Sequence, residues 1–320
     1  MRRNTMKKKI FIDGSEGTTG LRIFERFEGR DDIEILKIPS ELRKDPDEIK
    51  KYINASDVTF LCLPDAAARE AVALVENENV TIIDTSTAHR TEEGWAYGYP
   101  ELSPAHRDAI KTGKRIAVPG CYATGFITTV YPLVAGGILP KDYPVSSFGV
   151  SGFSGGGKKM IAQYQAEERE AELDSPRQYA LTQSHKHLKE MQKITGLAKA
   201  PLFSPIVADY YNGMVVTIPL YTDMLTEKKT PEELHAYLEQ YYAGEKFVKV
   251  MPFGKEAEYG GFIGSNACAG WDGIEIYVSG NEDRVVISTR FDNLGKGASG
   301  AAVQCLNIVL GCEEDKGLVL

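Results

Sequence analysis

The stretch KKIFIDGSEGTTGLRIFERF, residues 8–27, decides the fold of the N-terminal part of the chain. Residues 8–13 are a short and mostly apolar run, which predicts a buried strand. Residues 21–27 carry apolar side chains at helical spacing and predict a helix. The glycine-rich segment 14–20 therefore joins a strand directly to a helix, as at the start of a βαβ unit.

This glycine-rich segment has the composition of a dinucleotide site in a variant spacing. Gly14, Gly17 and Gly20 give G-x-x-G-x-x-G, whereas the usual fingerprint is G-x-G-x-x-G. Glycines permit a tight turn close to a pyrophosphate, and the following helix presents N–H groups and its positive dipole end. We expect Thr18 and Thr19 to add hydroxyl donors. The alternative is a turn that serves only helix–strand packing.

The end of the second predicted strand, residues 33–38, indicates which dinucleotide binds. An NAD site needs a carboxylate there for the ribose diol, and an NADP site needs a cation for the 2′-phosphate. Glu41 keeps the first interpretation open, but Ser40, Arg43 and Lys44 form the better phosphate cluster. We therefore predict NADP(H), with a solvated polar loop as the alternative.

The remaining pattern predicts a two-domain α/β protein. Apolar runs at 58–63 and 80–84 alternate with helical segments at 45–52 and 64–76, which predicts a Rossmann-like, doubly wound parallel sheet. After about residue 118 the strands become longer and more alternating, which predicts an α+β domain with a mixed, mostly antiparallel sheet. Its expected strands are 144–151, 202–208, 213–221, 246–251 and 273–289, and its expected helices are 157–172 and 231–243.

We place the boundary between the two domains at residue 118. Residues 1–118 are expected to bind the dinucleotide, completed by a C-terminal helix at 297–320. Residues 119–296 are expected to bind substrate, carry the catalytic groups and form the oligomer. The apolar helix expected at 298–310 follows the turn GKGASG and should return to the first domain.

Composition argues against several classes of partner. The 320-residue chain has a net charge of −8, which disfavours nucleic acid and anionic membranes, and no apolar run approaches the roughly 18 residues of a membrane span. The basic start, MRRNTMKKK, lacks the apolar region of a signal peptide and is interpreted as a solvated leader. Five widely spaced cysteines predict no disulfide framework, no metal site and a reducing cytoplasmic location.

One cysteine, Cys121, differs from the other four in its surroundings. It follows the Pro119-Gly120 turn and precedes the apolar segment 126–137. If that segment is helical, Cys121 lies at its N-terminus, where the dipole and free N–H groups lower a thiol pKa and hold an oxyanion. We interpret Cys121 as a nucleophile and the other four as small buried side chains.

Two further segments carry polar groups that such a nucleophile needs. His185 and His187, in QSHKHLKEM, are candidate proton partners, although histidines in this setting are often simply exposed. SGFSGGGKK at 151–159 is a second glycine-rich loop, in which N–H groups around Ser154 and Gly155, with Lys158, would cradle a phosphate. An ordinary flexible loop is the alternative.

These segments together resemble the N-acetyl-gamma-glutamyl-phosphate reductase family, in the shorter of its two versions. The matching segments are GSEGTTG (14–20), DTSTAHR (84–90), YGYPE (97–101), PGCYATG (119–125), VSGFSGGGK (150–158), SHKH (184–187) and DNLGKGASGAAVQ (292–304). They occur in the family's order over nearly the whole chain, and PGCYATG is the most specific of them.

The resemblance implies NADPH-dependent reduction of N-acetylglutamyl 5-phosphate to the 5-semialdehyde with release of inorganic phosphate, a step of arginine biosynthesis. Cys121 matches the family's nucleophile. His185 is our choice for the catalytic acid/base, with His187 as the alternative. The longer version carries an Arg-Gly pair after a proline-containing strand, where this chain has Tyr211-Asn212-Gly213. The partner of the substrate carboxylate or phosphate is therefore open.

Candidates for that partner are Arg90, Lys158 and Arg177. The family resemblance also leaves related acyl phosphates open as substrates, such as aspartyl phosphate or a carrier-linked aminoadipyl phosphate. A dinucleotide-binding redox sensor, in which Cys121 is oxidised rather than acylated, is an alternative of another class. The large mixed sheet expected in the second domain favours a homo-oligomer, either a dimer or a tetramer.

Overall fold

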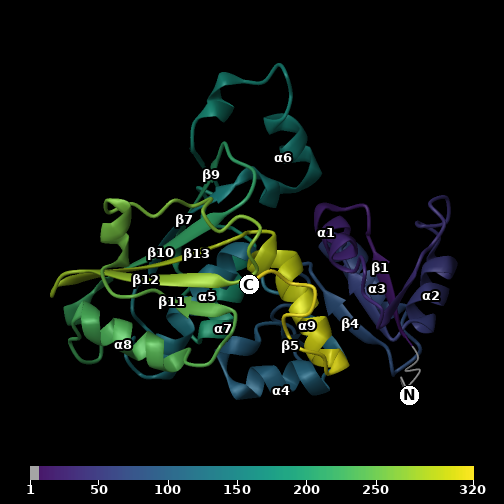
Figure 1. Cartoon of the computed structure of the whole chain (residues 1–320), viewed down its shortest axis with the longest axis horizontal. Coiled ribbons are helices and arrows are strands. Elements are labelled where there is room, and N and C mark those ends of the chain that lie inside the picture. Colours follow the sequence, from purple (N-terminus) through teal and green to yellow (C-terminus); the bar gives the residue numbers. More distant parts are fainter. Residues whose placement is uncertain (1–6) are drawn as a thin grey trace. The chain divides into compact units, whose positions relative to one another are not determined.

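The computed structural model describes residues 7–320, and the chain divides into two compact units. The residues up to Pro119 form the first unit together with Ala298–Leu318. Gly120–Gly297 and Val319–Leu320 form the second unit. Each unit is built around its own sheet (Figure 1). The first six residues of the proposed leader lie outside the described part of the chain.

The first unit contains a six-stranded sheet, sheet A, in the order β2-β1-β3-β4-β6-β5 within the described residues. Each of its pairings is parallel. Its strands are β1 (Lys8–Asp13), β2 (Ile33–Leu36), β3 (Val58–Leu61), β4 (Thr81–Asp84), β5 (Ala96–Tyr97) and β6 (Arg115–Ala117). Its helices are α1 (Thr18–Arg26), α2 (Pro46–Ala55), α3 (Asp65–Ala73), α4 (Pro104–Thr112) and α9 (Gly300–Leu310). The predicted Rossmann-like parallel sheet is confirmed.

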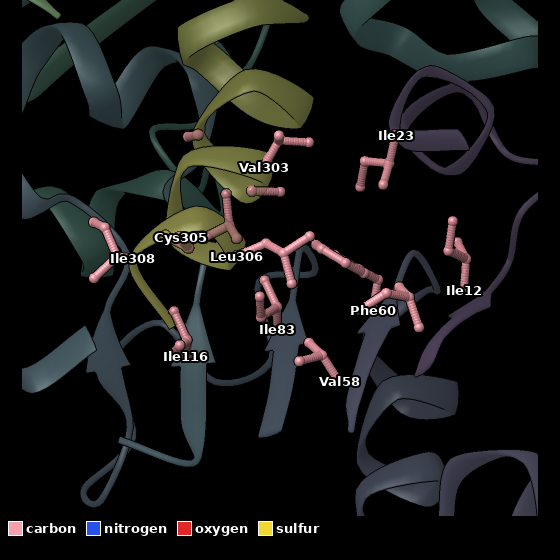
Figure 2. Packing of buried hydrophobic residues seen from close by; sticks show 14 of the residues in the cluster. Ile12, Ile23, Val58, Phe60, Ile83, Ile116, Val303, Cys305, Leu306 and Ile308 are labelled. Carbon is pink, nitrogen blue, oxygen red and sulfur yellow. The ribbon is translucent and has the colours of Figure 1, made fainter. Parts of the chain in front are cut away.

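Successive residues of the central strands fill separate cores on the two faces of sheet A. Phe60 and Ile83 belong to a core with residues of α1, α4 and α9. Leu61 and Ile82 point the other way, into a core with residues of α2 and α3. In Figure 2, Leu306 of α9 points toward Phe60 and Ile83. The C-terminal helix is therefore part of the core of the first unit.

The second unit contains a seven-stranded sheet, sheet B, ordered β11-β12-β13-β10-β7-β9-β8 in the part of the chain that is described. The pairs β11–β12 and β7–β9 are parallel, and the remaining neighbours are antiparallel. Its strands are β7 (Ser146–Gly152), β8 (Arg177–Gln178), β9 (Leu202–Ala208), β10 (Met214–Tyr221), β11 (Val248–Val250), β12 (Ile274–Gly280) and β13 (Arg284–Phe291). Its helices are α5 (Cys121–Ala135), α6 (Gly157–Tyr164), α7 (His187–Thr195) and α8 (Pro231–Tyr241). The predicted mixed, mostly antiparallel sheet is confirmed.

Helix α5 packs closely on one face of sheet B. A Cβ atom at Gly125 would lie 2.7 Å from Val216 Cγ2 and 2.6 Å from Thr289 Oγ1, so the helix approaches the sheet more closely than a side chain allows. The opposite face of sheet B, here called the outer face, carries the alternate residues of the same strands. Its exposed large apolar side chains are Phe148, Leu202, Tyr221 and Val286.

Three helices begin where the sequence places a capping side chain before a proline. Asp45, Ser103 and Thr230 each accept a hydrogen bond from a backbone N–H group in the first turn of α2, α4 and α8, respectively. The proline that follows lacks an N–H group that would need a partner, and its φ is already close to helical. Local sequence therefore determines where these helices start.

The helix predicted at 157–172 is wrong in length, because α6 ends at Tyr164. The residues that follow, AEEREAELD, are mostly charged and give no apolar stripe that could bury a helix face. Arg169 instead pairs with Asp174 at 2.5 Å and with Asp209 at 2.6 Å. The stretch predicted at 273–289 is a hairpin of β12 and β13, turning at Asn281.

The C-terminal segment of the first unit is held near β2 by Arg30. The guanidinium donates to the two carboxylate oxygens of Asp32, at 3.0 and 2.7 Å, and to Asn307 Oδ1 at 2.6 Å. The Arg30 side chain is only 4% exposed. Its hydrogen bonds hold the pKa of Asp32 well below its usual range, although partial burial of the carboxyl acts in the opposite direction.

We expect Arg30→Met to lower the free energy of unfolding by about 2–3 kcal/mol at neutral pH, because Asn307 Oδ1 loses this donor and Asp32 keeps only its ion pair with Lys316. The folded pKa of Asp32 is depressed, so this stabilisation is complete above the ordinary carboxyl pKa of 3.8 and is lost as the pH falls below it. Urea unfolding of variant and parent should therefore converge in acid. Arg22→Met, which removes an exposed pair with Glu25, is the control; an equal loss there would contradict the prediction.

Candidate active site

Cys121 is the first residue of α5, the helix that begins at the Pro119-Gly120 turn. Gly120 is the N-cap residue, and the Cys121 side chain is half-buried. Nearly all of α5 beyond its first residue is buried, so its N–H groups and its positive dipole end act in a medium of low polarity. A helix N-terminus is one of the positions at which reactive thiolates are found in proteins.

A buried carboxylate holds the start of this helix. Glu190 Oε1 accepts a hydrogen bond from the Gly120 N–H group at 2.9 Å, and Glu190 is 2% exposed. Glu190 lies on α7, three residues after His187, so the two side chains share one face of that helix. Glu190 was not predicted from the sequence. The only signal was its helical spacing from a candidate histidine, which becomes visible once α7 is known to start at His187.

The two candidate histidines lie together beside the residue that follows Cys121. The ring centroid of Tyr122 lies 6.1 Å from that of His185 and 6.4 Å from that of His187. The two imidazole rings are 4.7 Å apart and nearly perpendicular. Tyr122 is itself fixed, because its hydroxyl donates to the Ile206 carbonyl at 3.0 Å. The structure thus brings both histidines to the N-terminal turn of α5.

The two histidines differ in burial and in hydrogen bonding. His187 is 4% exposed, whereas His185 is half-buried. The His187 N–H group donates to His185 Nδ1 at 3.2 Å, so His185 caps the start of α7. A nitrogen that accepts this bond carries no proton, which assigns the neutral His185 proton to Nε2. Both residues remain candidates for proton transfer.

Tyr179 also belongs to this site. Its ring lies 5.8 Å from that of His185 and 6.4 Å from that of Tyr122, and the residue is 37% exposed. The surrounding protein and a charge on Cys121 both raise the pKa of its hydroxyl. Tyr179 follows β8, and the nearby Gln183 amide makes two hydrogen bonds with the Phe203 backbone, at 2.8 and 2.9 Å. Nothing in the local sequence marked Tyr179, because its proximity to Cys121 results from the path of this long connection.

The turn after β13 presses against Cys121. A Cβ atom at Gly297 would lie 3.0 Å from the Cβ of Cys121. The Asp292 carbonyl accepts from the Gly297 N–H group at 3.1 Å, and the Asp292 side chain accepts from the Leu294 N–H group at 2.8 Å. A side chain at 297 would therefore push against the Cβ atom of the candidate nucleophile.

The second glycine-rich loop is attached to this same turn. Ser154 Oγ accepts from Asn293 Nδ2 at 2.9 Å, and the Ser154 N–H group donates to the Tyr211 carbonyl at 3.1 Å. Ser154 is 1% exposed, and its polar groups serve internal contacts. Gly155 and Lys158 are exposed and stay candidates for binding a phosphate.

The arginines proposed for anion binding make internal contacts. In the first unit, Arg90 donates to the Val118 carbonyl at 2.8 Å and to the Thr85 carbonyl at 3.1 Å, and it is 8% exposed. It thereby links the segment that follows β4 to the segment that follows β6. In the second unit, Arg177 donates to the Tyr164 hydroxyl at 2.9 Å. These contacts give both arginines a role in holding loops in place.

The glycine-rich segment of the first unit fits a dinucleotide. Gly14 has φ +82°, and a Cβ atom there would lie 2.4 Å from the Cys62 carbonyl oxygen. A Cβ atom at Gly20 would lie 2.3 Å from the Gly14 oxygen. Gly17 caps α1 through its backbone, and Thr18 and Thr19 are the first two residues of the helix. The segment therefore presents main chain, where a pyrophosphate would need close approach.

The predicted 2′-phosphate cluster lies in the turn after β2. Ser40, Arg43 and Lys44 are all exposed. Arg43 forms an ion pair with Glu16 of the glycine-rich segment, so the two predicted parts of the cofactor site are in contact. Among residues 7–320, no histidine, cysteine and carboxylate side chains are grouped to hold a metal ion, and no helix is long and apolar enough to cross a membrane.

Comparison with known proteins identifies the family of the chain. Residues 9–111 match the model of the semialdehyde dehydrogenase NAD binding domain, and residues 121–293 match that of the semialdehyde dehydrogenase dimerisation domain. The chain is 48% identical over 320 residues to N-acetyl-gamma-glutamyl-phosphate reductase 2 of a Nostoc species, covering 98% of this chain and 99% of the relative. It is 45% identical over 310 residues to the N-acetyl-gamma-glutamyl-phosphate reductase of Brucella ovis, covering 96% and 100%.

Solved structures share the fold at lower identity. The aspartate semialdehyde dehydrogenase of Francisella tularensis superposes with a TM-score of 0.71 at 16% identity, covering 95% of this chain and 100% of that one. Aspartate semialdehyde dehydrogenase II of Vibrio cholerae, complexed with ASA, superposes with a TM-score of 0.70 at 14% identity. The match covers 96% of this chain and 99% of that one. The resemblance found in the sequence is thus confirmed, and the chain belongs to the N-acetyl-gamma-glutamyl-phosphate reductases, within the semialdehyde dehydrogenase family.

Proposed function

We propose that the chain reduces N-acetyl-L-glutamyl 5-phosphate with NADPH, giving N-acetyl-L-glutamate 5-semialdehyde and phosphate, as a step of arginine biosynthesis. The observation that carries the proposal is Cys121 at the N-terminus of α5, with two histidines beside it. Substrate and cofactor follow from the reductases to which the chain is 45–48% identical over nearly its full length.

The first half of the reaction forms a thioester on Cys121. The thiolate attacks the acyl carbon of the substrate, and a new C–S bond forms. The carbonyl oxygen becomes an oxyanion, which the N–H groups and positive dipole end of α5 stabilise. The C–O bond to phosphate then breaks, and phosphate leaves with the electron pair of that bond.

The second half releases the aldehyde. NADPH, when bound, supplies a hydride to the thioester carbonyl carbon. The resulting oxyanion at Cys121 again lies at the start of α5. Its collapse breaks the C–S bond, which frees the aldehyde and restores the thiolate.

The two histidines have separate proposed roles: one takes up and returns the proton of the Cys121 thiol, and the other donates a hydrogen bond to the substrate oxyanion. The hydrogen bond from the His187 N–H group to His185 Nδ1 disfavours the doubly protonated form of His185. We propose that His187 therefore accepts and returns the proton, and that His185 donates a hydrogen bond through Nε2. This modifies the choice made from sequence, where His185 was the preferred acid/base.

In this proposal the first unit binds the cofactor through Gly14, Gly17, Thr18, Thr19 and Gly20, with Ser40 and Arg43 at the 2′-phosphate. The second unit supplies the catalytic groups and the dimer contact. We propose a cytoplasmic location, which is supported by the free thiols of the cysteines, all of which lie within the described residues.

We expect Cys121→Ser to lower turnover by about 10³-fold or more, because an alcohol is a far weaker nucleophile than a thiolate, while NADPH binding is retained. The measurement is the reverse reaction, in which aldehyde, NADP⁺ and phosphate produce NADPH absorbance. N-acetylglutamate and aspartate semialdehydes are compared side by side. Cys312→Ser, at another half-buried cysteine, is the control and should keep full activity. Preference for aspartate semialdehyde would refute the proposed substrate.

The pH dependence of kcat separates the two histidines. His187→Asn should lower kcat by about 10²-fold and abolish the limb of the profile that reports the histidine pKa. His185→Asn should lower kcat and keep that limb, because it removes a neutral hydrogen-bond donor. Loss of the limb in His185→Asn alone would reverse the two roles.

We also propose that the chain forms a homodimer through the outer face of sheet B. That face exposes Phe148, Leu202, Tyr221 and Val286, and residues 121–293 match a dimerisation domain. Exposed large apolar side chains gathered on one face of a sheet favour association. A second copy of the same face is the occupant, because one apolar surface repeated on two chains gives a closed twofold contact.

Replacing Phe148 and Leu202 together by glutamate should give a monomer in light-scattering measurements, because like charges would meet across the twofold axis. Phe262→Glu is the matched control: Phe262 is 78% exposed but lies in the loop before β12, and this variant should remain dimeric. A dimeric double variant, or a monomeric parent, would rule out this interface.

A further inference from the structure

Glu16 forms an ion pair that has no role in the proposed reaction. Its Oε2 atom pairs with Nη1 of Arg43. Glu16 lies between Gly14 and Gly17, whereas Arg43 lies in the turn after β2. Because β1 and β2 are adjacent parallel strands, the loops that follow them leave the same edge of sheet A. The pair therefore connects the segment that would hold the pyrophosphate to the turn that would hold the adenosine ribose.

The two members of this pair have opposite preferences for the ribose 2′ position. A cation there favours the 2′-phosphate of NADP, and a carboxylate favours the 2′-hydroxyl of NAD. Arg43 supplies the cation. Glu16 supplies a carboxylate at the same place, although it comes from the glycine-rich segment and not from the end of β2.

The pair is open to exchange. The side chains of Arg43 and Glu16 are 44% and 57% exposed, and an ion pair in water stabilises little. A phosphate dianion carries more charge than a carboxylate and offers oxygens that match the guanidinium fork. Arg43 can therefore leave Glu16 for a phosphate at small cost, but the carboxylate remains nearby as a competitor and as a like charge.

We propose that Glu16 is a specificity-determining residue: its carboxylate competes with the 2′-phosphate of NADPH for Arg43. The inference rests on the proposed use of NADPH. Glu16 pairs with Arg43 when no 2′-phosphate is bound, and this competition lowers the affinity for NADPH. The ratio of the NADPH affinity to the NADH affinity is therefore smaller than it would be without Glu16.

Calorimetric titration of the full chain tests the inference without relying on turnover. The probes are adenosine 2′,5′-bisphosphate, which carries the 2′-phosphate, and 5′-AMP, which lacks it. At low salt, Glu16→Gln should strengthen binding of the bisphosphate about fivefold and leave 5′-AMP unchanged. Arg43→Gln should weaken the bisphosphate about tenfold, again with little change for 5′-AMP.

A double variant shows whether Glu16 acts through Arg43. In the Arg43→Gln background, most of the gain from Glu16→Gln should disappear, because the residue for which the carboxylate competes is gone. Glu25→Gln is the matched control, since it removes one exposed carboxylate that also pairs with an arginine, Arg22 at 3.7 Å on α1. It should bind both probes as the parent does.

The outcomes separate this inference from the proposed function. A parent that binds NADPH, with bisphosphate affinity unchanged in Glu16→Gln, overturns the role of Glu16 and leaves the reductase assignment intact. A full gain that persists without Arg43, or appears equally in Glu25→Gln, also overturns it, because general charge repulsion then explains the effect. A parent that binds neither NADPH nor the bisphosphate overturns both proposals.

Discussion

The hydrogen bond between the Gly120 N–H group and the Glu190 carboxylate is the contact on which the candidate site depends. It fixes the start of α5, and therefore Cys121, against α7. Burying a carboxylate is costly unless it is paired with donors, and the positive end of α5 supplies both a donor and a favourable dipole. Glu190 occupies the N–H group of the N-cap residue, and in the proposed reaction the following N–H groups of the first turn stabilise the oxyanion. Helix α5 cannot slide to another position, since Gly125 fits it closely to sheet B.

One short helix, α7, therefore positions two kinds of group. His187 and Glu190 are three residues apart and therefore lie on one face of α7. His185 precedes the N-cap residue of α7, and its Nδ1 atom accepts a hydrogen bond from the N–H group of His187. The proposed acid/base groups and the carboxylate that holds the start of α5 therefore lie on one helix. Displacing α7 would therefore move both the proposed nucleophile and its proposed proton partner, and this face of the helix is buried at His187, Leu188, Glu190 and Met191.

The sequence allowed prediction of features that arise locally. A strand, glycines and a helical repeat within twenty residues determine the start of sheet A, and a Pro-Gly turn before an apolar segment puts Cys121 at a helix start. Glu190 and Tyr179 were missed because their contacts join residues far apart in the chain, and no local pattern records such packing. The helix predicted through 172 failed for a related reason, since charged residues with good helix propensity had no apolar surface on which to pack.

The charge of the chain poses a further constraint, because an acidic protein must bind a cofactor and a substrate that are both anionic. Its buried arginines do not solve this by themselves, since Arg30 pairs with Asp32, Arg290 with Glu275, and Arg90 donates to main-chain carbonyls. Backbone N–H groups at the starts of α1 and α5 bind anions without adding charge to the fold. Exposed cations are then needed only where one phosphate must be distinguished from a hydroxyl. We propose Arg43 as that cation, and its ion pair with Glu16 of the glycine-rich segment would then weaken its hold on the 2′-phosphate.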